Sequence, residues 1–499
     1  MATTVEHLTL DERSARGLAA RARTGPDSHS GWTPAPDRPD PVALIEEQNE
    51  RREPDLVPVR HGRMMASPFT FYRGAAKIMA ADLAGTPTAG LEVQLCGDAH
   101  LSNFGVFASP ERNLLFDIND FDETLPGPFE YDVKRLAASL TVAARNNGFA
   151  KSDAQAITKA AVRSYRETMA QFASMRTLDV WYAHTAEDEI KRSVAAFLAG
   201  ADGKGKQKGK GKGKGKHSAD PDGTTSMTGK ERKEATKRFE KNAQKAHSRN
   251  SDQALSKLGE EVDGRYRIAS VPPVIVPARD LHTAYGIKPG ELEDVVFELF
   301  RDYRSTLRPD VRQLLERFEI IDWARKVVGV GSVGTRAFIV LLQGRDRGDP
   351  LFLQVKEATR SVLEGVLRKS TYRQPGERVV QGQRLMQASS DIFLGWSKGV
   401  QADRYFYWRQ LRDMKGSALV ELMAPATMAF YARTCGWTLA RAHARSGDAV
   451  SIAAYLGDDD AFDTSITDFS ERYAAQNEQD FAAFTDAIGS HRIEAVQQV

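Results

Sequence analysis

The chain has 499 residues, of which 41% are hydrophobic and 27% charged, a composition typical of globular proteins and long enough for two to four domains. The formal net charge of +2 depends on seven lysines between Lys204 and Lys216, so the rest of the chain is mildly acidic and we expect no nucleic-acid partner. Two cysteines without metal-ligand spacing argue against a disulfide framework or a zinc site, and the lack of a signal sequence or long apolar run predicts a cytoplasmic protein without a membrane partner.

The first 183 residues change from a polar arm to a dense, ordered segment. Residues 1–60 are rich in Arg, Pro and Asp and are expected to form an N-terminal arm with one helix at 42–49. Residues 61–183 are expected to contain a helix at 74–83, a strand at 91–95, a hairpin with arms at 104–107 and 114–118, and a helix at 133–145. Two polar motifs interrupt these elements.

The middle of the chain is expected to be a charged helical insert, residues 184–265, followed by a helical connector, residues 266–324. Within the insert, the Lys/Gly tract at 202–217 cannot bury a core, so we expect a disordered, self-repelling loop. A solvated linker is the preferred interpretation of this tract, and weak polyanion binding is the alternative.

The chain becomes β-rich at 325–424, where strand-like runs occupy 327–342, 351–356, 392–396 and 405–411. Residues 425–499 return to helical periodicity and include the amphipathic run FYARTCGWTLARAHAR. The whole pattern predicts an α+β protein.

The first polar motif, CGDAHLSNFG, contains Asp98 and Asn103 and follows the strand at 91–95; we call it the motif loop. Phosphoryl transfer needs a carboxylate that orients and accepts the proton of the attacking hydroxyl, and oxygen ligands for Mg²⁺. An Asp followed five residues later by an Asn can supply both. The alternative is a turn whose side chains bond only to the local backbone.

The second motif, DINDFDE, places Asp117, Asp120 and Asp122 at the end of the hairpin. Closely spaced acids repel one another unless they share a cation, so this run favours a metal site. A solvated acidic loop is the alternative, but it would rarely contain Ile118 and Phe121 between the acids.

A third motif, VVGVGSVGTR, places Gly329, Gly331 and Gly334 between two predicted strands. Glycine lets the backbone close over phosphates so that amide N–H groups face the anion. A strand–loop–strand setting is the kinase arrangement and differs from the dinucleotide fingerprint, which joins a strand to a helix. A tight glycine hairpin without a ligand is the alternative.

The strand after the glycine loop, LFLQVK, ends at Lys356. It resembles the kinase strand whose lysine reaches the α and β phosphates, although a single strand lysine is often an edge charge. The carboxylate partner of Lys356 is open between Glu364 and Glu377, with Glu364 weakly favoured.

Three further residues are supporting candidates. Arg73, in SPFTFYRG, and His443, in LARAHARSGD, are candidates for contacting phosphate or positioning the motif loop, and His100 lies within CGDAHLSNFG. The alternatives are a core ion pair for Arg73 and a hydrogen-bonded helix histidine for His443. Asp132 is expected to tie the motif loop to the helix that follows it.

The order of these parts differs from that of ordinary kinases, because the motif loop near residue 98 precedes the glycine loop near residue 331. A circular permutation explains this order and requires the helix that introduces the catalytic loop to lie near the C-terminus. GWTLARAHARSGD, at 436–448, resembles that helix of aminoglycoside-phosphotransferase-like kinases.

CGDAHLSNFG resembles the HGDxHxxN loop of aminoglycoside and choline kinases, and INDFDETLPGPFEYDVKRL resembles their metal-binding segment. The resemblance implies that Asp98 is the catalytic base and that Asn103 and Asp120 bind metal, with the two neighbouring aspartates as alternative ligands. Two departures are a longer spacing from Asp98 to Asp120 and Cys96 in the place of the usual histidine.

Nearly the full chain is similar to an uncharacterised bacterial family, the domain of unknown function 2252 family. The similarity lies in RMMASPFTFYRGAA, CGDAHLSNFG, NDFDETLPGPFEYDVKRLAASL, SKLGEEVDG and LARAHARSG. The family name implies no activity, so the functional expectation comes from the kinase-like motifs.

We therefore expect a kinase-like two-lobe fold in circularly permuted order. Residues 61–183 would form the catalytic-loop part of a helical lobe, 325–424 the nucleotide lobe, and 425–499 the helices that complete the helical lobe. The expected function is ATP- and Mg²⁺-dependent phosphoryl transfer to a small hydroxyl-bearing molecule. The alternatives are a nucleotide-binding regulatory module without transfer, and nucleotidyl transfer.

Overall fold

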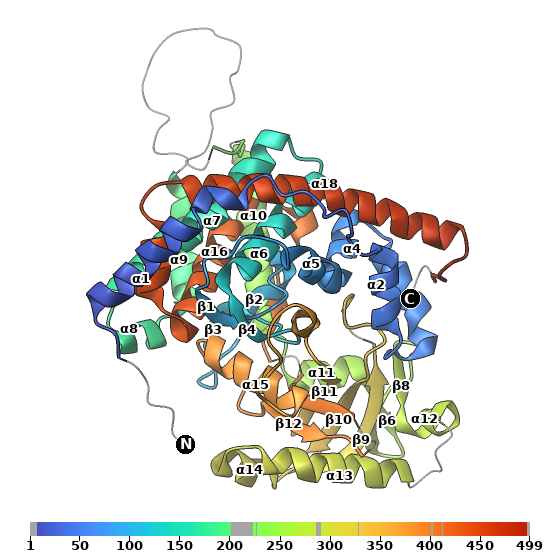
Figure 1. Ribbon diagram of the computed structural model, residues 1–499. Helices are drawn as coiled ribbons and strands as arrows, with labels where there is room; N and C mark the ends of the chain where they lie inside the picture. Colours follow the sequence, from blue (N-terminus) through green and yellow to red (C-terminus); the bar gives the residue numbers. More distant parts are fainter. Residues whose placement is uncertain are drawn as a thin grey trace.

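A helical body and a six-stranded antiparallel sheet lie one above the other in the computed structural model (Figure 1). The structure describes residues 7–200, 223–225, 227–285, 291–327, 329–400, 403–411 and 413–496. The predicted Lys/Gly tract at 202–217 lies outside the described residues. Helices and strands are both present in quantity, so the predicted α+β class is confirmed.

The bounds of the elements are as follows. The described helices are α1 (Leu10–Arg23), α2 (Pro41–Asn49), α3 (Val57–Met64), α4 (Pro68–Gly74), α5 (Ala76–Leu83), α6 (Phe129–Asn146), α7 (Lys151–Ser174), α8 (Thr177–Tyr182), α9 (Glu187–Gly200), α10 (Gly229–His247), α11 (Ser251–Leu258), α12 (Ala278–Tyr285), α13 (Glu291–Ser305), α14 (Pro309–Leu315), α15 (Pro375–Met386), α16 (Pro425–Ser446), α17 (Ala449–Leu456) and α18 (Ala461–Gly489). The described strands are β1 (Glu92–Leu95), β2 (Phe104–Ala108), β3 (Leu114–Ile118), β4 (Leu125–Pro128), β5 (Thr185–Ala186), β6 (Gly259–Val262), β7 (Arg265–Ile268), β8 (Ile275–Pro277), β9 (Glu319–Lys326), β10 (Ala337–Gln343), β11 (Pro350–Glu357), β12 (Gly395–Lys398), β13 (Tyr405–Gln410) and β14 (Gly416–Ser417).

The helical body joins segments from both ends of the chain. Helix α6 is buried along nearly its whole length because α7, α16 and α18 surround it. Helix α1 packs against α17, so the N-terminal residues also belong to this body. The result is one large apolar core that includes Phe129 of α6, Leu439 of α16 and Phe469 of α18. The helices after residue 425 therefore lie beside the segment that carries the motif loop (Figure 1).

The sheet has the strand order β12-β13-β11-β10-β9-β8, and each adjacent pair is antiparallel. One face packs on α13 and α14 through residues such as Leu353 and Trp408. The other face changes character along β11, where Phe352 packs with α11 while Gln354 and Lys356 follow at alternate positions. Because side chains alternate between faces of a strand, these three residues share one face and form a gradient from apolar to charged.

The strand-like run at 327–342 is a strand only in its second part, β10, and the glycine motif forms the turn between β9 and β10, in the strand–loop–strand setting predicted for it. Gly329 and Gly334 have φ angles of 69° and 86°, so the chain turns in a conformation that favours glycine. The predicted strand at 392–396 lies slightly later, as β12, and the sheet also takes in β8 from before residue 325. The helices and strands predicted around the motif loop are otherwise confirmed by α5, β1, β2, β3 and α6.

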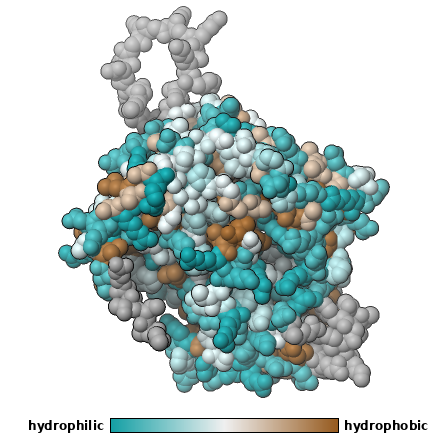
Figure 2. Space-filling model, in the orientation of Figure 1, coloured by the Kyte–Doolittle hydropathy of each residue, from teal (hydrophilic) through white to brown (hydrophobic). Residues whose placement is uncertain are grey.

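The N-terminal segment packs over the body and reaches the sheet. Arg38 donates hydrogen bonds to Asp82 of α5 and to Asp480 of α18, which fixes the chain ahead of α2. Figure 2 shows a surface that is mainly hydrophilic, with apolar residues in small separate patches on the face in view. In the part of the chain that the structure describes, no helix is both long and apolar enough to cross a membrane.

Candidate functional site

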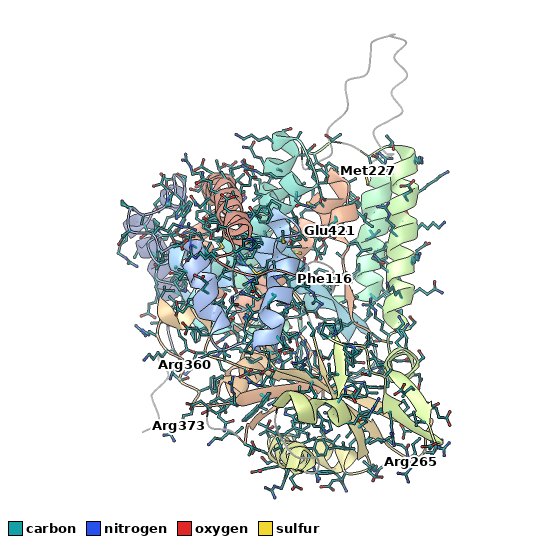
Figure 3. All side chains as sticks on the ribbon, turned by 90° about the vertical axis from the view of Figure 1, so that its right-hand side faces the viewer. Phe116, Met227, Arg265, Arg360, Arg373 and Glu421 are labelled. Atoms are coloured by element: carbon teal, nitrogen blue, oxygen red, sulfur yellow. The ribbon has the colours of Figure 1, made fainter. Side chains whose placement is uncertain are left out.

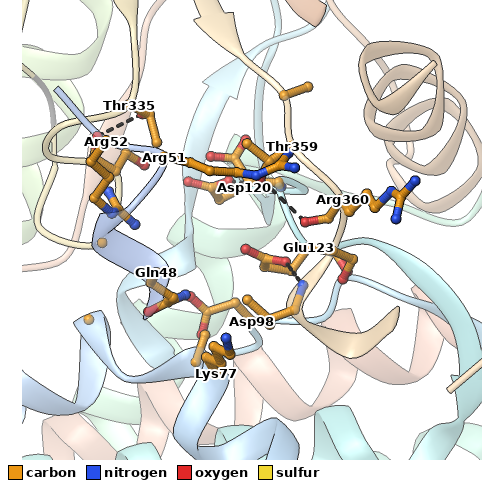
Figure 4. Close-up of a pocket in the computed structure, with 18 of the residues that line it drawn as sticks. Gln48, Arg51, Arg52, Lys77, Asp98, Asp120, Glu123, Thr335, Thr359 and Arg360 are labelled. Atoms are coloured by element: carbon orange, nitrogen blue, oxygen red, sulfur yellow. Dashed lines mark hydrogen bonds between the residues drawn. The ribbon is translucent and has the colours of Figure 1, made fainter. Parts of the chain in front are cut away.

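A cavity of about 530 Å³ lies where the motif loop, the glycine loop and the segment after β11 meet (Figure 4). It brings together most of the residues predicted from the sequence. Those that line it are Arg73, Asp98, His100, Asn103, Asp120, Asp122, Gly329, Gly331 and Glu364. Figure 3 shows Arg360, another lining residue, at the level where the helical body gives way to the sheet.

Asp98 lies in the loop between β1 and β2, with one carboxylate oxygen already engaged. Its Oδ1 accepts a hydrogen bond of 2.8 Å from Nε of the buried Arg135 on α6. Its Oδ2 lies 3.8 Å from Nε2 of His100. Burial lowers the pKa of His100 to about 3, so the imidazole is neutral at physiological pH. Oδ2 is therefore the oxygen of Asp98 that can meet a ligand in the cavity.

Asn103 closes the same loop and is oriented by it. Its Nδ2 donates to the backbone oxygen of Asp98 at 2.8 Å, which fixes the amide plane. Within the described residues, Oδ1 of Asn103 accepts no hydrogen bond and is left for a ligand in the cavity that Asn103 lines.

The base of the motif loop is anchored from two helices. The carboxylate of Asp132 on α6 accepts hydrogen bonds from the backbone amides of Cys96 at 2.8 Å and Gly97 at 3.0 Å. His443 of α16 contacts the same carboxylate at 3.2 Å and Tyr165 of α7 at 2.9 Å. The expectation that Asp132 ties the loop to its helix is confirmed. His443 is fully buried and does not line the cavity, so it acts on the loop through Asp132.

Gly97 also requires its lack of a side chain. Its φ is 85°, and a Cβ atom there would lie 2.2 Å from the backbone oxygen of Glu123. The motif loop therefore packs directly against the second motif, residues 117–123, which we call the acidic segment.

The three aspartates of the acidic segment have different surroundings. Asp117 is buried away from the cavity, where it pairs with Arg441 and accepts the amide of Ala388 at 2.8 Å. Asp122 accepts hydrogen bonds of 2.6 Å from both Lys356 Nζ and Tyr407 Oη, so both its oxygens are engaged.

Asp120 is the aspartate with the most accessible charge. Its Oδ2 lies 3.9 Å from Lys356 Nζ, and its Oδ1 accepts the amide of Asp122 at 3.2 Å. Burial opposes ionisation, but Lys356, and behind it Arg409 and Lys415, hold the pKa of Asp120 below its usual range.

Asn103 and Asp120 fit a Mg²⁺ site of the kind that is completed by phosphate oxygens. Among the described residues, no three His, Cys, Asp or Glu side chains are grouped so as to hold a metal ion by themselves. Mg²⁺ commonly takes only one or two protein carboxylates and keeps waters or phosphates as its other ligands. An open amide oxygen and an ionised carboxylate in one cavity meet that smaller requirement.

Lys356 is 3% exposed and does not itself line the cavity, but it pairs with Asp120 and Asp122, which do. It emerges from β11 opposite Tyr407 of β13, and its ammonium group pairs with Asp122 at 2.6 Å. Its described carboxylate partners are thus Asp122 and Asp120, and neither of the glutamates considered from the sequence. Glu364 instead caps its own short helix through Ser361 while lining the cavity.

The glycine loop is held from its outer side by the N-terminal segment. Arg52 donates a hydrogen bond of 2.5 Å to the backbone oxygen of Val333, and the amide of Glu53 donates to Gly334 at 2.7 Å. A Cβ at position 334 would lie 3.0 Å from Cβ of Arg52, so glycine permits this close packing. Within the described chain, the amides of Gly331 and Ser332 donate to no protein group, which leaves them available to an anion.

Several residues that line the cavity or hold its lining in place were missed by the sequence reasoning. Arg135 and Tyr407 hold the two central aspartates, Arg52 holds the glycine loop, and Glu123 lines the cavity with its pKa raised to about 7 by burial. Tyr407 is buried on β13. It lies opposite Lys356 in the register of the two strands, and the alternation of side chains along a strand could have indicated that the two residues share a face. Nothing in the sequence, by contrast, indicates that Arg52 lies beside the glycine loop.

Residues 52–212 and 207–487 match the family described as "Uncharacterized protein conserved in bacteria (DUF2252)", and the chain belongs to this family. No curated protein and no solved structure matches the chain. Since the family description names no activity, a functional proposal rests on the cavity itself.

Proposed function

We propose that the chain is an ATP- and Mg²⁺-dependent phosphotransferase of kinase-like, circularly permuted organisation that acts on a small hydroxyl-bearing molecule. The observation that carries the proposal is the convergence of four separated segments on one cavity: the motif loop, the acidic segment, the glycine loop and the end of β11. Each segment supplies one of the parts that phosphoryl transfer requires. Unrelated weak motifs would have no reason to meet.

The parts have separate tasks in this proposal. The free amides of Gly331 and Ser332 would bind phosphate oxygens, and the ammonium group of Lys356 would neutralise them. Asn103 and Asp120 would hold Mg²⁺, which supplies charge neutralisation on the phosphates. The Oδ2 atom of Asp98 would orient the attacking hydroxyl and accept its proton.

The strand arrangement supports the same assignment. The glycine loop joins the adjacent strands β9 and β10, and the lysine follows on the next adjacent strand, β11. This is the order of glycine loop and lysine strand in kinases. The helix with LARAHA, α16, packs in the body beside the motif loop, where a permuted order requires it.

A second candidate function, nucleotide binding without transfer, is favoured by one observation. Arg135 occupies Oδ1 of Asp98, so a single oxygen remains for the attacking hydroxyl. A regulatory module would keep the nucleotide contacts and need no further use of Asp98.

Isothermal titration of the full chain with ATP and MgCl₂ is the direct test. We expect saturable binding, loss of binding in Lys356→Met, and unchanged binding in Asp310→Asn, an exposed control on α14. Absence of binding at millimolar nucleotide would overturn the proposal.

Turnover separates the two candidates. Asp98→Asn preserves shape while it removes the proton acceptor, so we expect it to bind ATP but to lose ADP formation on a panel of hydroxyl compounds. Wild type and Asp98→Asn that bind ATP and are equally inactive would favour the regulatory module. The mass of any product distinguishes phosphoryl from nucleotidyl transfer.

A further inference from the structure

A second cavity, of about 410 Å³, lies on the same face of the sheet but opens on the other side of the acidic segment. Its walls come from β11 and β13, from the end of α10 with α11, from α15 and from β2. Helix α10, which starts just after the labelled Met227 in Figure 3, descends towards the sheet and brings Lys245 to the rim. None of the residues proposed to act in phosphoryl transfer lines this second cavity.

Among the described residues, five basic side chains and two acidic ones line this second cavity. The basic residues are Lys245, Arg249, Lys257, Arg409 and Lys415. In the described part of the chain, none of these five is within ion-pair distance of a carboxylate; Arg249 instead donates to the backbone oxygen of Lys415. Carboxylates act on Arg409 and Lys415 only from beyond ion-pair distance, through Asp120 and Asp122 behind the floor of the cavity.

The two acids are committed to other groups. Asp391 accepts the backbone amides of Phe393, at 2.9 Å, and Gln410. Burial raises the pKa of Asp391 to about 6, so its carboxylate is ionised at neutral pH and acts on Arg409 from beyond ion-pair distance. Asp413 pairs with Arg112, which does not line the cavity. Neither acid forms an ion pair with any of the five basic residues.

The floor of the cavity carries a donor that has no acceptor. Asn119 is 8% exposed, and its Nδ2 makes no hydrogen bond among the described residues, although it lines the cavity. The backbone oxygen of Asn119 accepts from Arg409 Nη1 at 3.3 Å and lies 3.5 Å from Lys415 Nζ. Nδ2 itself faces Gly105 of β2, where a Cβ atom would lie 2.8 Å from it, so the two cations gather at the backbone oxygen of Asn119.

The electrostatics at the floor of the cavity also favour an anionic ligand. Burial and the neighbouring Arg409 lower the pKa of Lys415 to about 7, although Asp120 and Asp122 act in the opposite direction and Lys356 adds to the lowering. Gathering like charges in a partly buried space is unfavourable, and an anion removes the repulsion.

We propose that the second cavity binds a small molecule that carries a phosphate or diphosphate group. Arg409 and Lys415 would contact the anion at the floor, and Lys245 and Lys257 would attract it at the rim. Phosphate suits this arrangement because it accepts several charge-assisted hydrogen bonds at once.

The site is distinct from the proposed nucleotide cavity but shares a wall with it. Asn119 lines the second cavity, and Asp120, the next residue, lines the first. Occupation of the second cavity would therefore act on the segment that carries a proposed Mg²⁺ ligand. The inference concerns anion binding alone and does not depend on phosphoryl transfer in the first cavity.

The test is titration of the full chain with inorganic pyrophosphate, without Mg²⁺, followed by calorimetry. We expect one pyrophosphate to bind with sub-millimolar affinity. The double variant Lys245→Gln/Lys257→Gln removes both rim charges and should weaken binding at least about tenfold. The matched control, Lys237→Gln/Lys241→Gln, removes two lysines from α10 that do not line the cavity and should change the affinity less than about twofold.

Three results would overturn the proposal. One is no heat of binding at several millimolar pyrophosphate. Another is equal weakening by the two double variants, which would mean diffuse attraction to a basic helix. The third is displacement of pyrophosphate by ATP and MgCl₂, which would assign the anion to the nucleotide cavity. Independent binding of both ligands supports two sites, and a protein that binds pyrophosphate but no ATP would contradict only the proposed phosphotransferase.

Discussion

Two cavities lie on one face of the sheet, and they differ in whether the cations beside them form ion pairs with acids. On β11, Lys356 belongs to the first cavity's charge cluster and Gln354, two residues earlier on the same face, lines the second. Lys356 has Asp122 at 2.6 Å and Asp120 at 3.9 Å, whereas Arg409, opposite Gln354, has an amide oxygen as its side-chain partner.

The difference shows that the balance of charges, more than their number, separates the two sites. The lining of the first cavity contains acids as well as bases, so it suits a ligand that brings both phosphates and a cation. Among the described residues, the bases of the second cavity form no ion pair, so it suits an anion alone. Changes that unbalance the first cavity or balance the second test this comparison.

The largest effect is expected from Lys356→Met. This change leaves Asp120 and Asp122 without their cation, in surroundings where charge is expensive to bury. We expect the free energy of unfolding to fall by about 3 kcal/mol and ATP affinity to fall about 100-fold. Urea denaturation and calorimetric titration measure the two quantities.

Lys398→Met is the matched control, because Lys398 lies on β12 of the same sheet with an exposed side chain. It should change neither quantity by more than about 0.5 kcal/mol. If Lys356→Met is as stable as this control, the pairing of Lys356 with the two aspartates does not stabilise the protein as described.

A smaller effect is expected from Arg52→Ala, which removes the hydrogen bond to the glycine loop but leaves the loop sequence intact. Loosening the loop should weaken ATP binding about tenfold, since its amides would no longer be held over the phosphates. Arg51→Ala removes the same charge from the same cavity without such a bond. Equal losses in the two variants would indicate long-range attraction and would contradict the positioning role of Arg52.

The sequence predicted the parts of the first cavity better than their connections. Asp98, Asn103 and Lys356 were found because phosphoryl transfer restricts residue type and spacing within a short segment. The partner of Lys356 was not found, because Asp122 lies 234 positions away and only the fold brings the two together.

The second cavity was beyond prediction for a related reason. Its cations come from α10, α11, β13 and the turn after β13, and no local pattern links them. Whether a cation lacks a carboxylate partner also depends on which residues the fold brings near it, and a single sequence does not show this. Strand bounds near the glycine motif failed for a local reason, because the positive φ angles of Gly329 and Gly334 turn a stretch whose apolar alternation looks continuous.

A third change adds an ion-pair partner for Arg409 in the second cavity. Gln354→Glu has nearly the same shape and places a carboxylate against Arg409, whose Nε lies 2.9 Å from the present amide oxygen. We expect pyrophosphate affinity to fall about fivefold, which corresponds to about 1 kcal/mol, and ATP affinity to stay the same. Gln253→Glu, at the α11 side of the cavity, tests whether the effect requires contact with Arg409. Unchanged or tighter pyrophosphate binding in Gln354→Glu would contradict the role of Arg409.

The smallest effect is expected from Glu123→Gln and depends on pH. Burial raises the pKa of Glu123 to about 7, against about 4.3 in an unfolded chain. Between these values the unfolded state binds fewer protons than the native state, so this residue's contribution to stability is complete at low pH and is lost as pH rises to about 7. Glutamine keeps an acceptor for the amide of Val362, now at 2.7 Å, and does not ionise. The variant should therefore gain about 1 kcal/mol over wild type between pH 5 and pH 8 in urea denaturation, a value reduced for partial exposure to solvent. Glu364→Gln removes a charge from the same cavity, and an equal gain in that variant would assign the effect to general repulsion among the acids, not to the buried position of Glu123.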